Sequence, residues 1–235
     1  MKKRIFALVV LSSMTILSVM PFLGHNITSN EINTSILETT NVTIEKNTEL
    51  IVAQPIEEET TETTWENLIN QMNEEIDKIP YDFNNMEQKQ QWFITYKEVI
   101  AKYPKELHML TIYDVYTEAE LDLLFRIVQA EVGDEYDFDE KANVASVIFN
   151  RLSSGNYYSI TEVLTAKNQF SPYWDGRYRK VEVDEKTILA CEYVFLFGDT
   201  TGGCYGFQMK YVPGWNGWEY QFKDDCHYFY KRKEN

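Results

Sequence analysis

Basic side chains are scarce in this sequence of 235 residues, which has 22 Lys and Arg against 37 Asp and Glu and a formal net charge of −15. Nucleic-acid binding needs clustered Lys and Arg to contact phosphates. The only dense basic runs are Lys2-Lys3-Arg4 and Lys231-Arg232-Lys233. The composition therefore argues against a nucleic-acid partner, and the length is sufficient for one domain with extensions.

Cysteine and histidine are also few, with three of each. Cys191, Cys204 and Cys226 are widely spaced and fit no zinc motif, so no metal site and no cofactor is expected. An odd number leaves at least one thiol unpaired. Cys204 and Cys226 lie in strand-like segments and could pair, a point that the sequence leaves open.

The N-terminus has the pattern of an export signal. Lys2-Lys3-Arg4 precedes an apolar run from Ile5 to Gly24, which predicts a cleaved signal peptide or an uncleaved signal anchor over residues 1–24. We therefore expect an exported protein that is secreted, associated with the cell wall or anchored outside the cytoplasmic membrane. Any membrane contact would be made through this segment alone.

Two regions precede the expected domain. Residues 25–64 are rich in Thr, Asn, Glu and Ile and contain no glycine, which predicts a disordered spacer. In residues 65–115, apolar side chains recur at intervals of three and four, with a stop at Pro80, so we expect a helical region. Its first part, 65–103, is predicted to form a helical hairpin that docks on the domain that follows.

Residues 116–235 are expected to form one compact domain of class α+β, mainly α. Capping residues followed by apolar periodicity predict helices that begin after Thr117, after Asp137 or Asp139, after Ser159 and after Asp184. They are expected to end at about Val132, before Gly155, at about Lys167 and at Gly198. Two later runs, CYGFQMKYV and EYQFKDDCHYFYK, predict a small sheet or hairpin.

Glu131 is an unexpected residue on the apolar face of the first of these helices. At ~100° per residue, it lies about 20° from Leu124 and about 40° from Ile127. It also lies in the last turn, where the helix dipole disfavours a negative charge. Burial and the dipole both raise the pKa of a carboxyl group, which suits a general acid. The alternative is a structural carboxylate, exposed or paired with Arg126 or Arg151.

Several segments resemble the SleB-type cell wall hydrolases, the family that includes spore cortex-lytic enzymes. They are AEVGDEY, NVASVIFNRL, ITEVLTAKNQFSPYWDGR, TTGGCYGF and HYFY, within residues 117–230. The resemblance implies a lysozyme- or transglycosylase-like catalytic domain and assigns the catalytic glutamate to the Ala130-Glu131 pair. The family continues this pair with two residues and Gly-Glu. Here Gly133 follows after one residue, so either Asp134 or Glu135 is the expected supporting acid.

The chemistry implied by the resemblance is cleavage of the β-1,4 bond between N-acetylmuramic acid and N-acetylglucosamine in peptidoglycan. The family is similar to lytic transglycosylases that use a single glutamate, so Glu131 would serve as acid and then as base. A true hydrolase acting on the same bond, and a catalytically silent peptidoglycan-binding protein, are the alternatives. The sequence leaves open whether spore cortex or vegetative wall is the target.

The same resemblance points to residues that would bind the substrate. Gln169, Phe170 and Ser171 match the family's QFS and are expected to line the cleft, although Phe170 would serve equally as a core residue. Trp174 is a candidate for stacking on a sugar, and Tyr205 for a hydrogen bond to the substrate.

Other matched positions are expected to have structural roles. Asn150 and Arg151 are interpreted as bracing the second helix, and His227 as a buried residue. Trp215 and Trp218 either extend a glycan groove or close a hairpin.

Overall fold

The computed structural model describes residues 61–81 and 85–233. The predicted signal segment 1–24 lies outside this range, as does the predicted spacer up to residue 60. None of the helices within the described residues is long and apolar enough to cross a membrane.

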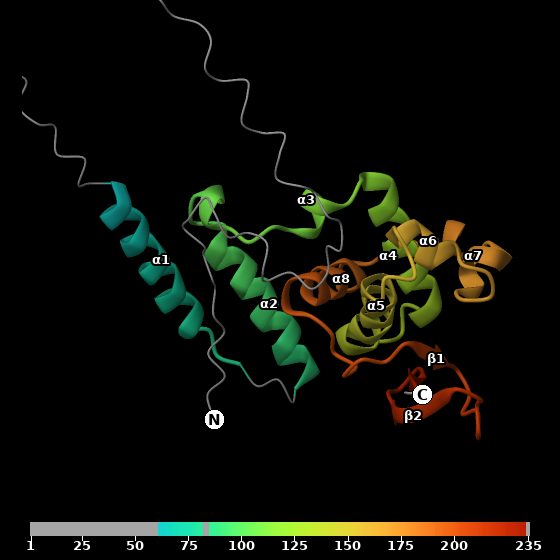
Figure 1. Cartoon of the computed structure of the whole chain (residues 1–235). Helices are drawn as coiled ribbons and strands as arrows, with labels where there is room; N and C mark the ends of the chain where they lie inside the picture. Colours follow the sequence, from blue (N-terminus) through green and yellow to red (C-terminus); the bar gives the residue numbers. More distant parts are fainter. Residues whose placement is uncertain (1–60, 82–84, 234–235) are drawn as a thin grey trace, which may run out of the picture.

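The first two helices lie side by side at one end of the structure (Figure 1). Helix α1 covers Thr61–Asp77 and helix α2 covers Met86–Ile100. The Asn85 side chain caps α2 by accepting a hydrogen bond of 3.1 Å from the Gln88 N–H. A 3₁₀ turn, η1 (Lys105–Leu107), and a short helix, α3 (Ile112–Val115), connect α2 to the rest of the chain.

Helix α2 is packed onto the domain through aromatic side chains. The ring of Phe197, the last residue of helix α8 (Glu185–Phe197), lies 5.4 Å from that of Trp92, 5.8 Å from that of Phe93 and 5.2 Å from that of Tyr96. The ion pair between Lys97 and Glu192 adds a polar contact between the same two helices. Helix α2 therefore shares a core with the residues that follow it.

The predicted helix starts of the main domain are confirmed. Helices α4 (Glu118–Val132), α5 (Phe138–Ser153), α6 (Ile160–Thr165) and α8 begin after Thr117, Asp137, Ser159 and Asp184. The capping box of α4 is present: the Thr117 hydroxyl and N–H donate to Glu120 Oε2 at 2.8 and 3.0 Å. Helix α5 is buried along most of its length and packs against α4, α6 and α8.

Two short elements separate α6 from α8: helix α7 (Ser171–Asp175) and the 3₁₀ turn η2 (Arg177–Arg179). Both pack against α4, and Figure 1 shows α7 beyond α6 at the edge of the domain. They were not predicted, because five residues and three residues are too short to show a helical period.

The chain ends in an antiparallel sheet with the strand order β1-β3-β2. Its strands are β1 (Gly206–Gln208), β2 (Trp218–Lys223) and β3 (Tyr228–Arg232). Phe229 on the inner face packs with Val147 of α5 in a small cluster. The prediction of a mainly helical α+β fold with a small late sheet is therefore confirmed. Cys191, Cys204 and Cys226 are free thiols in this structure.

Candidate active site

Glu131 occupies the last turn of α4, one residue before the helix ends at Val132. The side chains of Leu124, Ile127 and Val128 on the same face are fully buried, and Glu131 itself is partly buried. Burial raises the pKa of the Glu131 carboxyl group from 4.5 to about 7, against the opposing charge of Arg177. Because an anion loses hydration in this position, Glu131 holds its proton in the range near neutral pH.

The turn formed by α7 and η2 lies against Glu131. A hydrogen bond from the Ser171 backbone N–H reaches the Glu131 carboxyl group and lowers its pKa. Arg177 stabilises this turn with two hydrogen bonds: its Nη2 donates to Ser171 Oγ at 2.8 Å, and its Nε donates to Asp175 Oδ2 at 2.8 Å. Its Nη1 also reaches the Ala130 carbonyl oxygen at 3.4 Å. One guanidinium group thus joins the turn to the end of the helix that carries Glu131.

Arg151 approaches Glu131 from α5. Only 6% of its surface is exposed, and its Nε donates to the Tyr205 carbonyl oxygen at 2.7 Å. The guanidinium lies 4.9 Å from the Phe170 ring centroid, and its Nη1 has no hydrogen-bond partner among the described residues. Burial lowers the pKa of Arg151 to about 10, and its charge lowers that of Glu131. The sequence named Arg151 both as a brace and, with Arg126, as a possible partner of Glu131. Arg151 is an electrostatic neighbour of the candidate acid, whereas Arg126 donates to Asp122.

A buried polar network fixes the end of α4. Lys141 and Gln129 are both fully buried. Lys141 Nζ donates to the Gly133 carbonyl oxygen at 2.9 Å and pairs with Asp184 Oδ2 at 3.1 Å. Gln129 Oε1 accepts from Lys141, from the Asp184 N–H and from the Thr187 hydroxyl. These contacts hold the backbone on both sides of Glu131 in one position.

The two predicted supporting acids lie just beyond the helix and are exposed. Asp134 accepts a hydrogen bond of 2.5 Å from Gln129 Nε2. The Glu135 carboxylate folds over Gly133, where its Oε2 would lie 2.6 Å from an added Cβ. Their supporting roles stay predictions. The carboxylate whose charge raises the pKa of Glu131 is Asp175, which showed no sequence signal beyond its place in the YWDGR segment.

Of the predicted substrate-binding residues, three contact Glu131 or Arg151, and the other two are exposed nearby. Ser171 lies at Glu131, while Phe170 and Tyr205 both contact Arg151. Phe170 is completely buried, so its ring supports Arg151 and has no face available to a ligand. Gln169 and Trp174 are exposed beside these residues, and Trp174 Nε1 donates to the Ala166 carbonyl oxygen at 3.2 Å.

His227 is fully buried, with its ring centroid 4.6 Å from that of Phe207. Burial lowers its pKa to about 4, so the imidazole is neutral near pH 7. Its Nε2 lies 3.7 Å from Cys226 Sγ. The ring has the buried position expected from the sequence.

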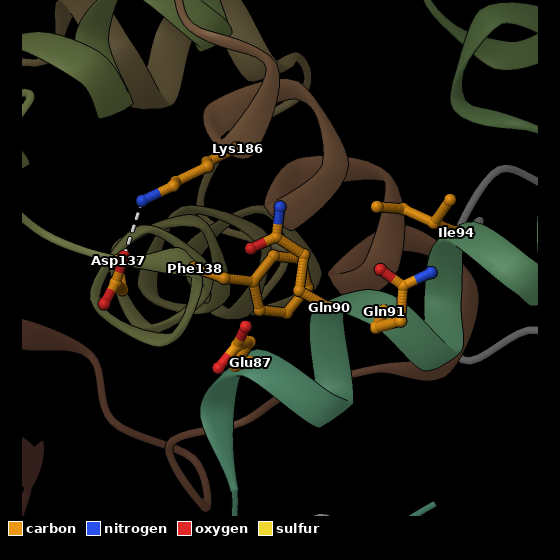
Figure 2. A pocket seen from close by; sticks show the side chains of 7 residues that line it. All are labelled: Glu87, Gln90, Gln91, Ile94, Asp137, Phe138 and Lys186. Carbon is orange, nitrogen blue, oxygen red and sulfur yellow. Dashed lines mark hydrogen bonds and ion pairs between the residues drawn. The ribbon is translucent and has the colours of Figure 1, made fainter. Parts of the chain in front are cut away.

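A separate pocket of about 370 Å³ lies between α2 and the first residues of α5 and α8 (Figure 2). It is lined by Glu87, Gln90, Gln91, Ile94, Asp137, Phe138 and Lys186. Lys186 pairs with Asp137 across one side of it. None of the residues predicted for catalysis or substrate binding is part of its lining, so it is not the candidate active site. Within the described residues, no group of three or more His, Cys, Asp and Glu is placed to hold a metal ion.

A partly buried carboxyl group that holds its proton near neutral pH and has two arginines nearby is suited to general acid/base chemistry. Residues 136–230 match the model of the SleB-type family described as Cell Wall Hydrolase. The match spans α5 to β3, begins after Glu131 and covers less than half of the chain. It supports an enzyme that acts on peptidoglycan. Among curated proteins and among solved structures, nothing matches the chain significantly.

Proposed function

We propose that the protein cleaves the glycan strands of peptidoglycan at the β-1,4 bond between N-acetylmuramic acid and N-acetylglucosamine, as a lytic transglycosylase. Glu131 is the catalytic acid and base. The observation that carries this proposal is the raised pKa of Glu131, about 7. Its side chain lies in the last turn of α4, on the same face as the buried Leu124, Ile127 and Val128. A carboxylic acid with that pKa donates its proton readily under neutral conditions.

The reaction begins with proton transfer from Glu131 to the glycosidic oxygen. The bond between this oxygen and C1 of the muramic residue breaks, and the glucosamine residue leaves with a free C4 hydroxyl group. Glu131 is then a carboxylate. The Ser171 N–H and the charges of Arg177 and Arg151 stabilise it, since each of them lowers its pKa.

The second step returns the proton to Glu131. The C6 hydroxyl of the muramic residue gives its proton to the carboxylate, and its oxygen bonds to C1 to close a 1,6-anhydro ring. No second nucleophile is needed for this sequence of steps. Enzyme and product then separate with Glu131 protonated, ready for the next bond.

Hydrolysis of the same bond is the alternative that a specific observation favours. Asp175 is a second carboxylate near Glu131. Its hydrogen bonds from Arg177 lower its pKa, so it is ionised at neutral pH. Glycosidases that invert or retain configuration use a second carboxylate of this kind. If Asp175 activates a water molecule, the product carries a reducing end in place of the anhydro ring.

The place of action in this proposal is outside the cytoplasmic membrane, because peptidoglycan lies there and residues 1–24 have the pattern of an export signal. Fractionation of cells that express the full chain tests this point. We expect the protein in the wall or medium fraction, or in the membrane fraction if the segment stays attached. Recovery from the cytoplasm alone would contradict it.

The type of reaction is tested by incubating the full chain with purified sacculi and determining the masses of the released muropeptides. Anhydro-muramic ends support the transglycosylase. Reducing ends would show that the protein is a hydrolase. An absence of soluble fragments, with the protein still sedimenting with the sacculi, would show that it is a catalytically silent peptidoglycan-binding protein.

A further inference from the structure

The outer face of the sheet, opposite Phe229 and α5, is lined by aromatic side chains. Gly206, Tyr230 and Tyr220 lie side by side across β1, β3 and β2, and residues two positions apart on a strand share a face. With two residues of the loop between β1 and β2, the aromatic members are Tyr211, Trp215, Trp218, Tyr220, Tyr228 and Tyr230. We call this surface the aromatic face.

The rings of the aromatic face hold one another in place. Trp215 stacks on Trp218 with centroids 4.6 Å apart and meets Tyr230 edge-on at 5.1 Å. Tyr211 meets Tyr220 edge-on at 5.3 Å. The Trp218 ring also lies so close to β1 that a Cβ on Gly206 would be 2.8 Å from it. A ligand that binds rings already fixed in this way loses little affinity to their ordering.

Part of this surface is open to solvent. Tyr211 is 50% exposed, Tyr220 is 41% exposed, and the neighbouring Met209 is 74% exposed. Tyr230 is buried beneath them, and its hydroxyl accepts a hydrogen bond of 2.9 Å from the Val212 N–H. The buried ring supports the exposed ones, so that these side chains are held at the surface where a ligand could contact them.

The charge of the aromatic face is opposite to that of the chain. The strand residues whose pairing places them on this face include Lys223 and Arg232 and no acidic residue, whereas the chain as a whole has a net charge of −15. Lys223 Nζ lies 5.7 Å from the Tyr228 ring centroid, and the Arg232 guanidinium lies 5.9 Å from that of Trp218. This combination suits a ligand with apolar faces and carboxylate groups.

The aromatic face adjoins the candidate active site. The guanidinium of Arg232 also lies 5.0 Å from the Tyr205 ring centroid. The Tyr205 carbonyl oxygen in turn accepts the hydrogen bond from Arg151, whose charge acts on Glu131. Tyr205 and Arg151 thus connect the aromatic face to the candidate active site.

We propose that the aromatic face binds the peptidoglycan glycan strand outside the catalytic position. The C–H faces of the sugar rings pack on Tyr211 and Tyr220, and carboxylates of the attached peptides meet Lys223 and Arg232. Tyrosine suits this role because its ring packs against apolar surface while its hydroxyl group bonds to polar groups. The proposal rests on the proposed function for the identity of the polymer.

The test uses the full chain with the substitution Glu131→Gln, which prevents cleavage. Its binding to sacculi that have been stripped of their anionic secondary polymers is measured by co-sedimentation. Adding Tyr211→Ala and Tyr220→Ala is expected to weaken binding by about tenfold or more. The matched control is Tyr81→Ala, since Tyr81 is 54% exposed and lies before α2. Adding Lys223→Met alone should make the binding less sensitive to salt.

Unchanged affinity in the double tyrosine variant would overturn the proposal. Sedimentation velocity in the absence of sacculi adds a second check: a dimer that the tyrosine substitutions dissociate would show that a second copy covers this face, and would also overturn it. Urea unfolding confirms that each variant is folded, and Tyr211→Ala alone replaces the double variant if that one is unstable. Because binding is measured without catalysis, loss of binding supports the aromatic face even if the unaltered protein cleaves nothing.

Discussion

Arg177 contacts both sides of the candidate active site: its Nη1 lies 3.4 Å from the Ala130 carbonyl oxygen, and its Nη2 donates to Ser171 Oγ at 2.8 Å. Ala130 precedes Glu131, and the Ser171 N–H bonds to the Glu131 carboxyl group. The same side chain therefore controls the geometry and the charge around the proposed acid.

Replacing this arginine should move the pH profile of the enzyme. The charge of Arg177 lowers the pKa of Glu131, so Arg177→Gln raises that pKa above about 7. Glu131 then stays protonated to higher pH, and the alkaline limb of kcat/KM shifts upward. Arg179→Gln is the matched control, because Arg179 lies on the same turn η2 and its guanidinium stacks on Tyr178. A limb that stays in place or moves to lower pH would contradict this role for Arg177.

Glu131 should also make stability depend on pH. Its pKa in the folded protein, about 7, is above its ordinary value of 4.5. The stabilisation by the protonated side chain is therefore complete below pH 4.5 and is lost as the pH rises through 7. Relative to Glu131→Gln, the unaltered protein should lose up to about 3 kcal/mol between pH 4.5 and 8. Urea unfolding of both proteins at several pH values measures the difference, and a pH-independent difference would argue against the raised pKa.

The buried ammonium group of Lys141 should be needed for both stability and catalysis. Lys141→Met leaves Gln129, Asp184 and the Gly133 carbonyl without this donor, so we expect a loss of roughly 3–5 kcal/mol in the free energy of unfolding. Cleavage should fall in the variant that remains folded, because the end of α4 is no longer held. Lys78→Met, at an exposed position after α1, is the control. If Lys141→Met unfolds at the same urea concentration as Lys78→Met, the network has no such role.

Helix α2 should be required for the stability of the region that matches the family model, residues 136–230. Phe93→Ala removes a fully buried ring from the contact with α8, which should cost roughly 3–5 kcal/mol in the free energy of unfolding. Glu98→Ala, on the exposed side of the same helix, should change little. A fragment starting at residue 110 loses all of α2 and should be less stable than the full chain. A fragment with unchanged stability would show that α2 is an independent addition.

The helices of the main domain could be predicted because their signals are local. Thr117, Asp137, Ser159 and Asp184 each precede an apolar periodic segment, and every one of them is an N-cap in the structure. Helical geometry also places Glu131 on the apolar stripe, but geometry left a structural role open, and the catalytic assignment came from the resemblance of the Ala130-Glu131 pair to the SleB-type family. The late sheet was indicated by alternating aromatic residues, although its strand order was not.

The surroundings of Glu131 depend on contacts between residues far apart in the sequence. Arg151 and Arg177 come from α5 and η2, and no periodicity relates either of them to α4. Helix α7 contains five residues, too few for a pattern. The QFS motif left Phe170 open between a cleft residue and a core residue, and its ring is fully buried beside Arg151 and Phe207. Tertiary packing decided these positions.

The most direct measurement is the rate at which Glu131→Gln releases soluble muropeptides from sacculi at neutral pH. The amide has nearly the shape of the acid but cannot donate the proton, so we expect a loss of roughly 10²- to 10⁴-fold. Glu118→Gln, which changes an exposed acid in the first turn of the same helix, should retain far more of the activity. A folded Glu131→Gln protein that digests sacculi as fast as the unaltered chain would contradict the account.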